Sequence, residues 1–530
     1  MPPPATPPGR RIALNTLIFS IATGLSRIAG LIREVVASSY FGTSGPFSAF
    51  TIAFQVPNLL RALVADSALS AAFVPVFTEL LEQRKRREAF ELAGALFGLI
   101  LVVLGVITIV FIVIAPWVIP PITGGEFTEE LDDLTVGLSR VMFPIVVLLG
   151  LNGFVVGILN AYDHFTIPAI SPVVWNFVII AGLVVLKPLF EGPNELYAYA
   201  IGVLAGTVVQ FAMCLPVLKR VGFELSISFS WHDPRIRRVL ALMLPVTIGL
   251  GLINFNLLIN SSLGSLVSEG APAAIDRAFR LYMLPQGIFS VSVATVLFPQ
   301  LSRLAARGDL AGLRATSGNG VRQIALLLIP AAFATAVLAE PLTRLVYERG
   351  EFGAGSTDDV AEALLWFSFS LPFSGANLLL TRTFFSIQRP WFTTVLAGMT
   401  LVINAGVSAA LYSSLGIAGI VIGTAVSTAA LTVAQAFFLR RELHGFEIGR
   451  TLRAVAGMLV AGAALGFVAY EVWDVLDGAL GRSLAGQLAS VGVALALGSA
   501  VYGAVVLALR IPEARQIIDL VRGRLNRGAS

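Results

Sequence analysis

Charged residues and cysteine are scarce in this sequence. Only 13% of its 530 residues are charged and a single one, Cys214, is cysteine, whereas 56% are hydrophobic. Soluble domains carry about 25% charged residues, so the composition predicts an integral membrane protein. One cysteine excludes an internal disulfide framework and any metal site that needs several cysteine ligands.

The common catalytic and nucleotide-binding motifs are absent too. The sequence has no P-loop lysine motif, no HExxH, no nucleophile elbow and no CxxC. Its three histidines, His164, His232 and His444, are isolated from one another. The net charge of +4 arises from basic residues in short loops between apolar segments, which does not indicate nucleic-acid binding. We therefore expect no enzyme activity, no metal site, no cofactor and no nucleic-acid partner.

Long apolar runs make up most of the chain. A bilayer-spanning helix needs about 20 apolar residues, and about fourteen such runs can be placed. They lie at 13–40, 47–81, 90–119, 134–160, 165–187, 196–218, 237–267, 272–302, 322–347, 359–386, 391–414, 416–439, 451–474 and 484–509. The expected fold is an all-α polytopic membrane protein. Small-xxx-small pairs such as Gly202/Gly206 and Gly462/Gly466 suit close packing of these helices.

Basic residues gather in alternate loops. Examples are the run at 84–87 and the pair Arg440-Arg441, whereas the intervening loop at 124–133, GGEFTEELDD, is acidic. By the positive-inside rule, the basic loops and both termini lie in the cytoplasm.

Short motifs also recur in the same order at nearly one spacing. The Gly-Glu-Phe at 125–127 returns at 350–352, and the Phe-Val-Pro at 73–75 returns as Leu-Phe-Pro at 297–299. This indicates two homologous six-helix lobes related by a pseudo-twofold axis along the membrane normal. The expected organisation is a disordered cytosolic tail at 1–12, an N-lobe at 13–220, a C-lobe at 221–442, two extra helices at 443–510 and a cytosolic amphipathic tail at 511–530.

Charged residues interrupt the first two apolar runs. They are Arg27, Arg33, Glu34, Arg61 and Asp66. Each arginine at mid-membrane depth costs about 2.5–3.5 kcal/mol on insertion scales, so a chain that keeps three of them is expected to need cations there. Arg27 and Glu34, seven residues apart, lie nearly on one face of a straight helix.

The matching run of the second lobe carries Asp276, Arg277 and Arg280. Asp276 lies one turn before Arg280, where an ion pair can form. Several guanidinium groups facing a cavity suit a phosphate or diphosphate, because their planar fork binds oxyanions bidentately and stays charged. The alternative is internal pairing, Arg27 with Glu34 or Arg61 with Asp66, which fixes helix packing only.

The stretch SRIAGLIREVVASSYFG at 26–42, followed by AFTIAFQVPNLLRALVAD and SAAFVPVFTE, resembles the MurJ (MviN) lipid II flippases of the MOP exporter superfamily. The resemblance continues through LNAYDHFTIPAISPVVWN, FRLYMLPQGIFSVSVATVLFPQLS and the ERGEF loop, so it covers both lobes. It implies a cavity between the lobes that opens alternately to the two sides of the bacterial plasma membrane. It also implies export of an undecaprenyl-diphosphate-linked muropeptide, lipid II, for cell-wall synthesis and cell shape.

The resemblance assigns residues by position. Those matched as substrate-binding are Arg27, Arg33, Arg61, Arg280 and Asn58. Those matched as gating or pairing are Glu34, Asp66, Asp276 and Ser48. The chain departs from the family at Ser48, where an acid is frequent, and at Phe279, where some members carry an acid. The usual Ala-Glu-Gly is Ala65-Asp66-Ser67 here.

Partners and competing functions follow from the same resemblance. Membrane lipids and cell-wall synthesis proteins are the expected partners besides the lipid-linked substrate, with the membrane potential or a monovalent ion as energy source. Another MOP-type exporter, of a different polyprenyl-linked glycan or of a drug, would share the architecture, although a drug/cation antiporter needs intramembrane acids that are few here. A non-transporting scaffold for cell-wall synthesis is the other alternative, but it gives no reason for arginines within the bilayer.

Overall fold

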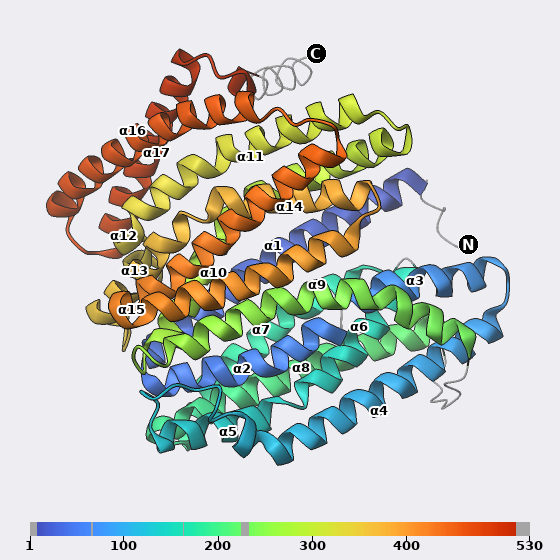
Figure 1. Cartoon of the computed structure of the whole chain (residues 1–530). Helices are drawn as coiled ribbons and strands as arrows, with labels where there is room; N and C mark the ends of the chain where they lie inside the picture. The colour runs from blue at the N-terminus through green and yellow to red at the C-terminus, as the bar shows by residue number, and fades with distance from the viewer. Residues whose placement is uncertain (1–7, 65–66, 163, 224–232, 516–530) are drawn as a thin grey trace. The chain divides into compact units, whose positions relative to one another are not determined.

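The computed structural model describes residues 8–64, 67–162, 164–223 and 233–515 (Figure 1). Its regular elements in these ranges are α-helices and two short 3-10 helices, and no strand occurs among the described residues. The expected all-α fold is therefore confirmed. The described residues form two units, divided after Gly270.

The first unit contains nine α-helices among its described residues. They are α1 (Pro8–Phe41), α2 (Gly45–Val64), α3 (Ser67–Glu82), α4 (Arg86–Val118), α5 (Glu129–Met142), α6 (Ile145–Ala161), α7 (Thr166–Leu186), α8 (Leu196–Arg220) and α9 (Pro234–Gly264), with η1 (Lys187–Leu189) and η2 (Gly192–Glu195) between α7 and α8.

The second unit continues with eight α-helices among its described residues. They are α10 (Ala271–Ala306), α11 (Leu310–Val337), α12 (Ala339–Tyr347), α13 (Ala354–Ser368), α14 (Leu371–Ser386), α15 (Pro390–Glu442), α16 (Ile448–Leu480) and α17 (Leu484–Ala508).

Packing in the first unit relies on aromatic rings and glycines. α1 packs on α7, and α7 packs on α8. A Cβ atom built on Gly182 would lie 2.7 Å from the Cα of Gly202, so only glycine allows these two backbones to approach so closely. Buried side chains of α3, α4 and α6 form a core that includes Phe73 and Phe154, whose ring centroids are 4.8 Å apart.

In the second unit, α10 packs on α11, α13 and α14, and α14 packs on α15. α15 is kinked at Gly416, which has φ 56° and ψ −132°, between the two apolar runs that the sequence separates there. The red helices α16 and α17 lie side by side and pack on α11 (Figure 1). Gly462 of α16 faces Phe333 of α11 at this contact.

Membrane-spanning helices are numerous. Within the described residues, nine helices are long and apolar enough to cross a bilayer, or ten if α13 and α14, bent by 49°, count as one span. α15 counts once there, although it covers two of the expected runs. The expected runs at 13–40, 47–81 and 237–267 fall on α1, on α2 with α3, and on α9. The chain is a multi-pass membrane protein.

The bounds that the sequence suggests for the lobes and the tails stay predictions. α9 packs on α2 and α3 of the first unit, whereas the lobes expected at 13–220 and 221–442 rest on sequence repetition and stay a prediction. The described part of α1 starts at Pro8, inside the tail expected at 1–12. Of the expected C-terminal tail, the described part includes the buried Ile511 and Glu513.

Candidate functional site

The buried charges of α1 are Arg33 and Glu34. Their residues are 8% and 4% exposed, and the two side chains form an ion pair with each other. The Cζ atom of Arg33 lies 4.9 Å from the ring centroid of Trp175 on α7. A buried guanidinium is costly unless other groups surround it, and here a carboxylate and an aromatic face both do so.

Arg27, in contrast, is exposed on α1, next to the exposed apolar side chains of Leu25 and Ile28. The sequence placed Arg27 and Glu34 nearly on one face, yet Glu34 pairs with Arg33. Seven residues are about 10 Å along a helix axis, which is too far for Arg27 and Glu34 to touch without a bend. Arg27 thus presents a guanidinium at the surface of the first unit, two turns from the buried ion pair.

On α2, the candidate Asn58 and the nearby Gln55 contact α9. Asn58 Nδ2 donates a hydrogen bond to Asn254 Oδ1 at 3.2 Å, and Gln55 Nε2 donates to Ser261 Oγ at 2.8 Å. Ser48 is fully buried at the start of the same helix.

Two candidates on or near α2 fall outside the description. Arg61 belongs to α2, but its side chain is not among the described parts, and Asp66 lies outside the described residues. Their predicted roles stay predictions.

The charges of α10 form a local cluster in the second unit. Arg280 Nε donates to Asp276 Oδ2 at 2.8 Å, so the expected pair one turn apart is present. Arg277 Nη1 contacts the same oxygen at 3.0 Å. The Arg277 side chain is 2% exposed and that of Arg280 is 34% exposed. The ring of Phe279, also on α10, packs against Phe367 of α13, with the ring centroids 5.7 Å apart.

Two further buried arginines join helices of the second unit. Arg322 on α11 pairs with Glu513, beyond α17, and with Glu447, which precedes α16. Arg344 on α12 pairs with Asp477 of α16. Sequence reasoning did not single these out. The rule that singled out charges in the first two apolar runs, an arginine within an apolar run, could have found them, since both arginines lie in the run at 322–347.

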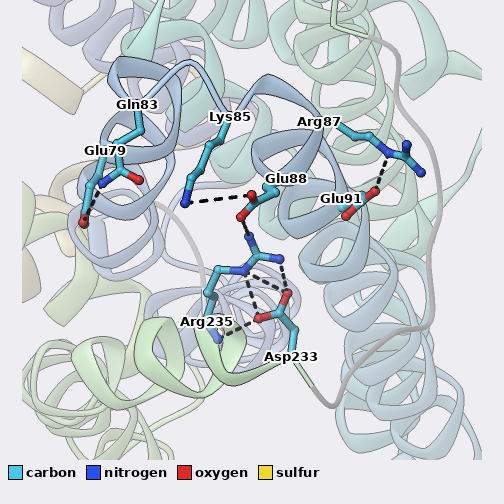
Figure 2. A network of polar contacts seen from close by, with 8 residues as sticks. All are labelled: Glu79, Gln83, Lys85, Arg87, Glu88, Glu91, Asp233 and Arg235. Carbon is cyan, nitrogen blue, oxygen red and sulfur yellow. Dashed lines mark hydrogen bonds and ion pairs between the residues drawn. The ribbon is translucent and has the colours of Figure 1, made fainter.

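A polar network joins the start of α4 to the start of α9 in the first unit (Figure 2). Arg235 binds both carboxylate oxygens of Asp233 and contacts Glu88 Oε2 at 2.9 Å. The hydrogen bond from Arg235 lowers the pKa of Asp233, and the same contact raises the pKa of Arg235. Asp233 also caps α9, because its side chain accepts from the Arg235 backbone N–H.

Metal ligands do not gather anywhere in the described part of the chain. No group there of three or more His, Cys, Asp or Glu side chains could hold a metal ion. The chemistry that the buried and exposed arginines offer is the binding of an oxyanion.

Comparisons with known proteins identify relatives of the whole chain. A probable lipid II flippase MurJ of Rhizobium meliloti is 30% identical over 517 residues, covering 96% of this chain and 95% of the relative. A lipid II flippase MurJ of Burkholderia cenocepacia is 35% identical over 360 residues, covering 67% of this chain and 69% of the relative.

Solved structures show the same fold. A lipid II flippase MurJ in an inward closed conformation matches with TM-score 0.76 and 22% identity, covering 92% of this chain and 98% of that chain. An inward-facing multidrug resistance transporter of the MATE family, in the MOP superfamily, matches with TM-score 0.66 and 16% identity. The match covers 79% of this chain and 94% of that chain. The fold is therefore of the MOP type. Because the family model described as lipid II flippase MurJ matches residues 37–474, the chain belongs to the MurJ family of lipid II flippases.

Proposed function

We propose that this protein moves lipid II, an undecaprenyl-diphosphate-linked muropeptide, from the cytoplasmic to the outer leaflet of the bacterial plasma membrane. Family membership over most of the chain and a multi-pass MOP-type fold support the proposal. The observation that carries it is the pair of arginines on α1. Arg33 is buried against Trp175 while Arg27 is exposed, and a bilayer-embedded helix keeps such charges at a cost of several kcal/mol.

The proposed ligands of the diphosphate are Arg27, Arg33, Arg61 and Arg280, with Asn58 as a neutral donor. A charge-assisted hydrogen bond contributes roughly 1.5–3 kcal/mol, so several guanidinium groups can hold a doubly phosphorylated head group while its isoprenoid tail stays in lipid. The Arg280 side chain is 34% exposed beside Asp276.

The proposed cycle is alternating access. Bound diphosphate neutralises the repulsion among the arginines, so the state that holds the substrate best gains population. Acidic partners of the arginines, Glu34, Asp66 and Asp276, are the proposed gating or pairing residues, together with Ser48. A membrane potential negative inside favours outward movement of an anion by about 2.3 kcal/mol per charge per 100 mV, and a monovalent ion is the other proposed energy source.

The proposed placement puts both termini in the cytoplasm, as the basic loops favour. The substrate and the surrounding membrane lipids are then the partners, together with proteins of cell-wall synthesis. We propose transport without enzyme chemistry.

The test is complementation of a bacterium depleted of its own lipid II flippase. Arg27→Ala and Arg280→Ala are expected to abolish growth rescue although the protein still inserts into the membrane. Loss of one charge-assisted bond weakens diphosphate binding by roughly 10- to 150-fold. Arg27→Lys keeps the charge but loses the fork, so a partial defect is expected.

The control is Arg87→Ala, because the Arg87 side chain is 93% exposed and pairs only with its helical neighbour Glu91 among the described residues. It should rescue growth fully. Full rescue by both alanine variants of the candidate arginines would refute their role, and failure of the unmodified protein to rescue growth would refute the proposed function.

A further inference from the structure

Trp175 on α7 is the aromatic neighbour of the buried arginine of α1. The Arg33 guanidinium carbon lies 4.9 Å from its ring centroid, within the range in which a cation is attracted to an aromatic face. An aromatic face contacts a guanidinium without using its N–H donors. The donors of Arg33 therefore remain suited to carboxylate or phosphate oxygens while the ring fixes the position of the group.

The indole is itself held in place by α8. Its Nε1–H donates to Thr207 Oγ1 at 3.1 Å, and the Thr207 hydroxyl donates to the Val203 carbonyl at 2.8 Å. Thr207 is fully buried. Rotation of the indole about its side-chain bonds would break this partly buried hydrogen bond, which is costly.

Close backbone packing makes room for this arrangement. A Cβ atom on Gly206 of α8 would lie 3.0 Å from the Trp175 carbonyl oxygen and 3.2 Å from its Cδ1 atom. Any larger residue at Gly206 would push the indole or the helix away. The next residue of α7, Asn176, is buried and its Nδ2 reaches the Ser26 carbonyl of α1 at 3.5 Å. α7 therefore holds α1 at two points, on either side of Arg27.

We propose that Trp175 is a positioning residue for Arg33 in diphosphate binding, with Thr207 fixing the orientation of the indole. The role rests on the proposed function, because it requires Arg33 to bind the substrate. A long side chain that is ordered before binding loses less conformational entropy when the ligand arrives, so the ring raises affinity without touching the ligand.

The experiment measures the dissociation constant of undecaprenyl diphosphate for the purified full-length protein in detergent. Trp175→Leu removes the aromatic face and is expected to weaken binding by about 2- to 30-fold, the range for a cation–π contact. Trp175→Phe keeps a ring and should bind within about threefold of the unmodified protein. Thr207→Val, which removes the acceptor of the indole N–H, should weaken binding less than Trp175→Leu does.

The decisive measurement is the double variant Arg33→Ala/Trp175→Leu. If Trp175 acts through Arg33, the double variant binds no more weakly than Arg33→Ala alone. Equal weakening by Trp175→Leu with and without Arg33 would overturn the proposal, because the tryptophan would then act through packing. The matched control is Trp366→Leu. Trp366 lies on α13 and its ring contacts Phe369, so this variant should bind undecaprenyl diphosphate normally.

Two other outcomes are informative. Unchanged affinity in Trp175→Leu would also overturn the positioning role while leaving the proposed function in place. If the unmodified protein does not bind undecaprenyl diphosphate, the proposed function fails and the role of Trp175 fails with it.

Discussion

Substitution of Arg322 by methionine should strongly destabilise the second unit. Arg322 lies on α11 with its side chain 2% exposed, and its Nε atom contacts Glu513 Oε1. The Glu513 side chain is 1% exposed, and its other oxygen has no hydrogen-bond partner among the described residues. Without Arg322, a carboxylate is left buried with no cation beside it.

The expected loss is about 3–5 kcal/mol of unfolding free energy, the usual cost of removing one partner of a buried ion pair. Glu447, the second carboxylate partner of Arg322, contributes less to this loss. Its Oε2 atom lies 2.9 Å from Arg322 Nη1, but its side chain is 33% exposed and also lies 3.8 Å from Arg450. Water and Arg450 can therefore compensate Glu447 but not Glu513.

The assay is unfolding of the purified protein in detergent, combined with the variants Glu513→Met and Arg322→Met/Glu513→Met. The double variant should be more stable than the sum of the single losses predicts, because it leaves no buried charge. Arg450→Met, with 56% of its side chain exposed, is the control and should change stability by less than about 0.5 kcal/mol. A loss below that value for Arg322→Met, or strict additivity in the double variant, would refute the reasoning.

Two further predictions concern packing and acid. Gly462→Ala should lower the free energy of unfolding by about 1–3 kcal/mol, because the new Cβ would lie 2.4 Å from Phe333 Cδ2. The control Gly478→Ala has open space around it and should be neutral or slightly stabilising. Equal melting temperatures for the two variants would contradict this. The pKa of Asp233 is lowered from 3.8 by its hydrogen bond with Arg235, so its stabilisation is present at neutral pH and is lost as the pH falls through that lowered value. Asp233→Asn should lower stability at neutral pH, and its difference from the unmodified protein should shrink as the pH falls below 3.8. A difference in melting temperature that does not change with pH would exclude the linkage.

Apolar runs in the sequence predicted where the helices lie but not where they break. The run at 134–160 is divided between α5 and α6 at Phe143-Pro144, and the run at 322–347 is divided after Val337. Mean hydropathy records the preference of side chains for lipid and contains no information on backbone bends. The kink of α15 at Gly416, where φ is 56°, was likewise not predicted, because the sequence showed only two separate apolar runs at 391–414 and 416–439.

Candidate cations could be found in the sequence because an arginine in an apolar run is conspicuous. Their partners could be found only in part: Asp276 was expected to pair with Arg280 and does so, but the partner of Arg33 was not expected. Helical spacing favoured Glu34 as a partner of Arg27, yet tertiary packing of α1 on α7 buries Arg33 and Glu34 together. Trp175 gave no signal, since an aromatic residue in an apolar run is ordinary, and only its position under Arg33 distinguishes it.

Among the described residues, the ion pairs of the arginines that lie in apolar runs therefore divide into two kinds. Arg322 and Arg344 have carboxylate partners on other elements, so each pair joins helices and internal pairing explains its presence. The Arg33–Glu34 and Arg280–Asp276 ion pairs each lie within one helix, α1 and α10, and Arg33 also contacts the Trp175 ring of α7.

This difference predicts different defects. Loss of Arg322 or Arg344 should lower stability. Transport should then fall only in proportion to the amount of folded protein that remains. Loss of Arg280, whose side chain is 34% exposed, should abolish transport while lowering the melting temperature less than loss of the 2%-exposed Arg322 does. A large fall in melting temperature for Arg280→Ala would place it with the structural arginines instead, and would leave Arg27 as the exposed cation on which substrate binding depends.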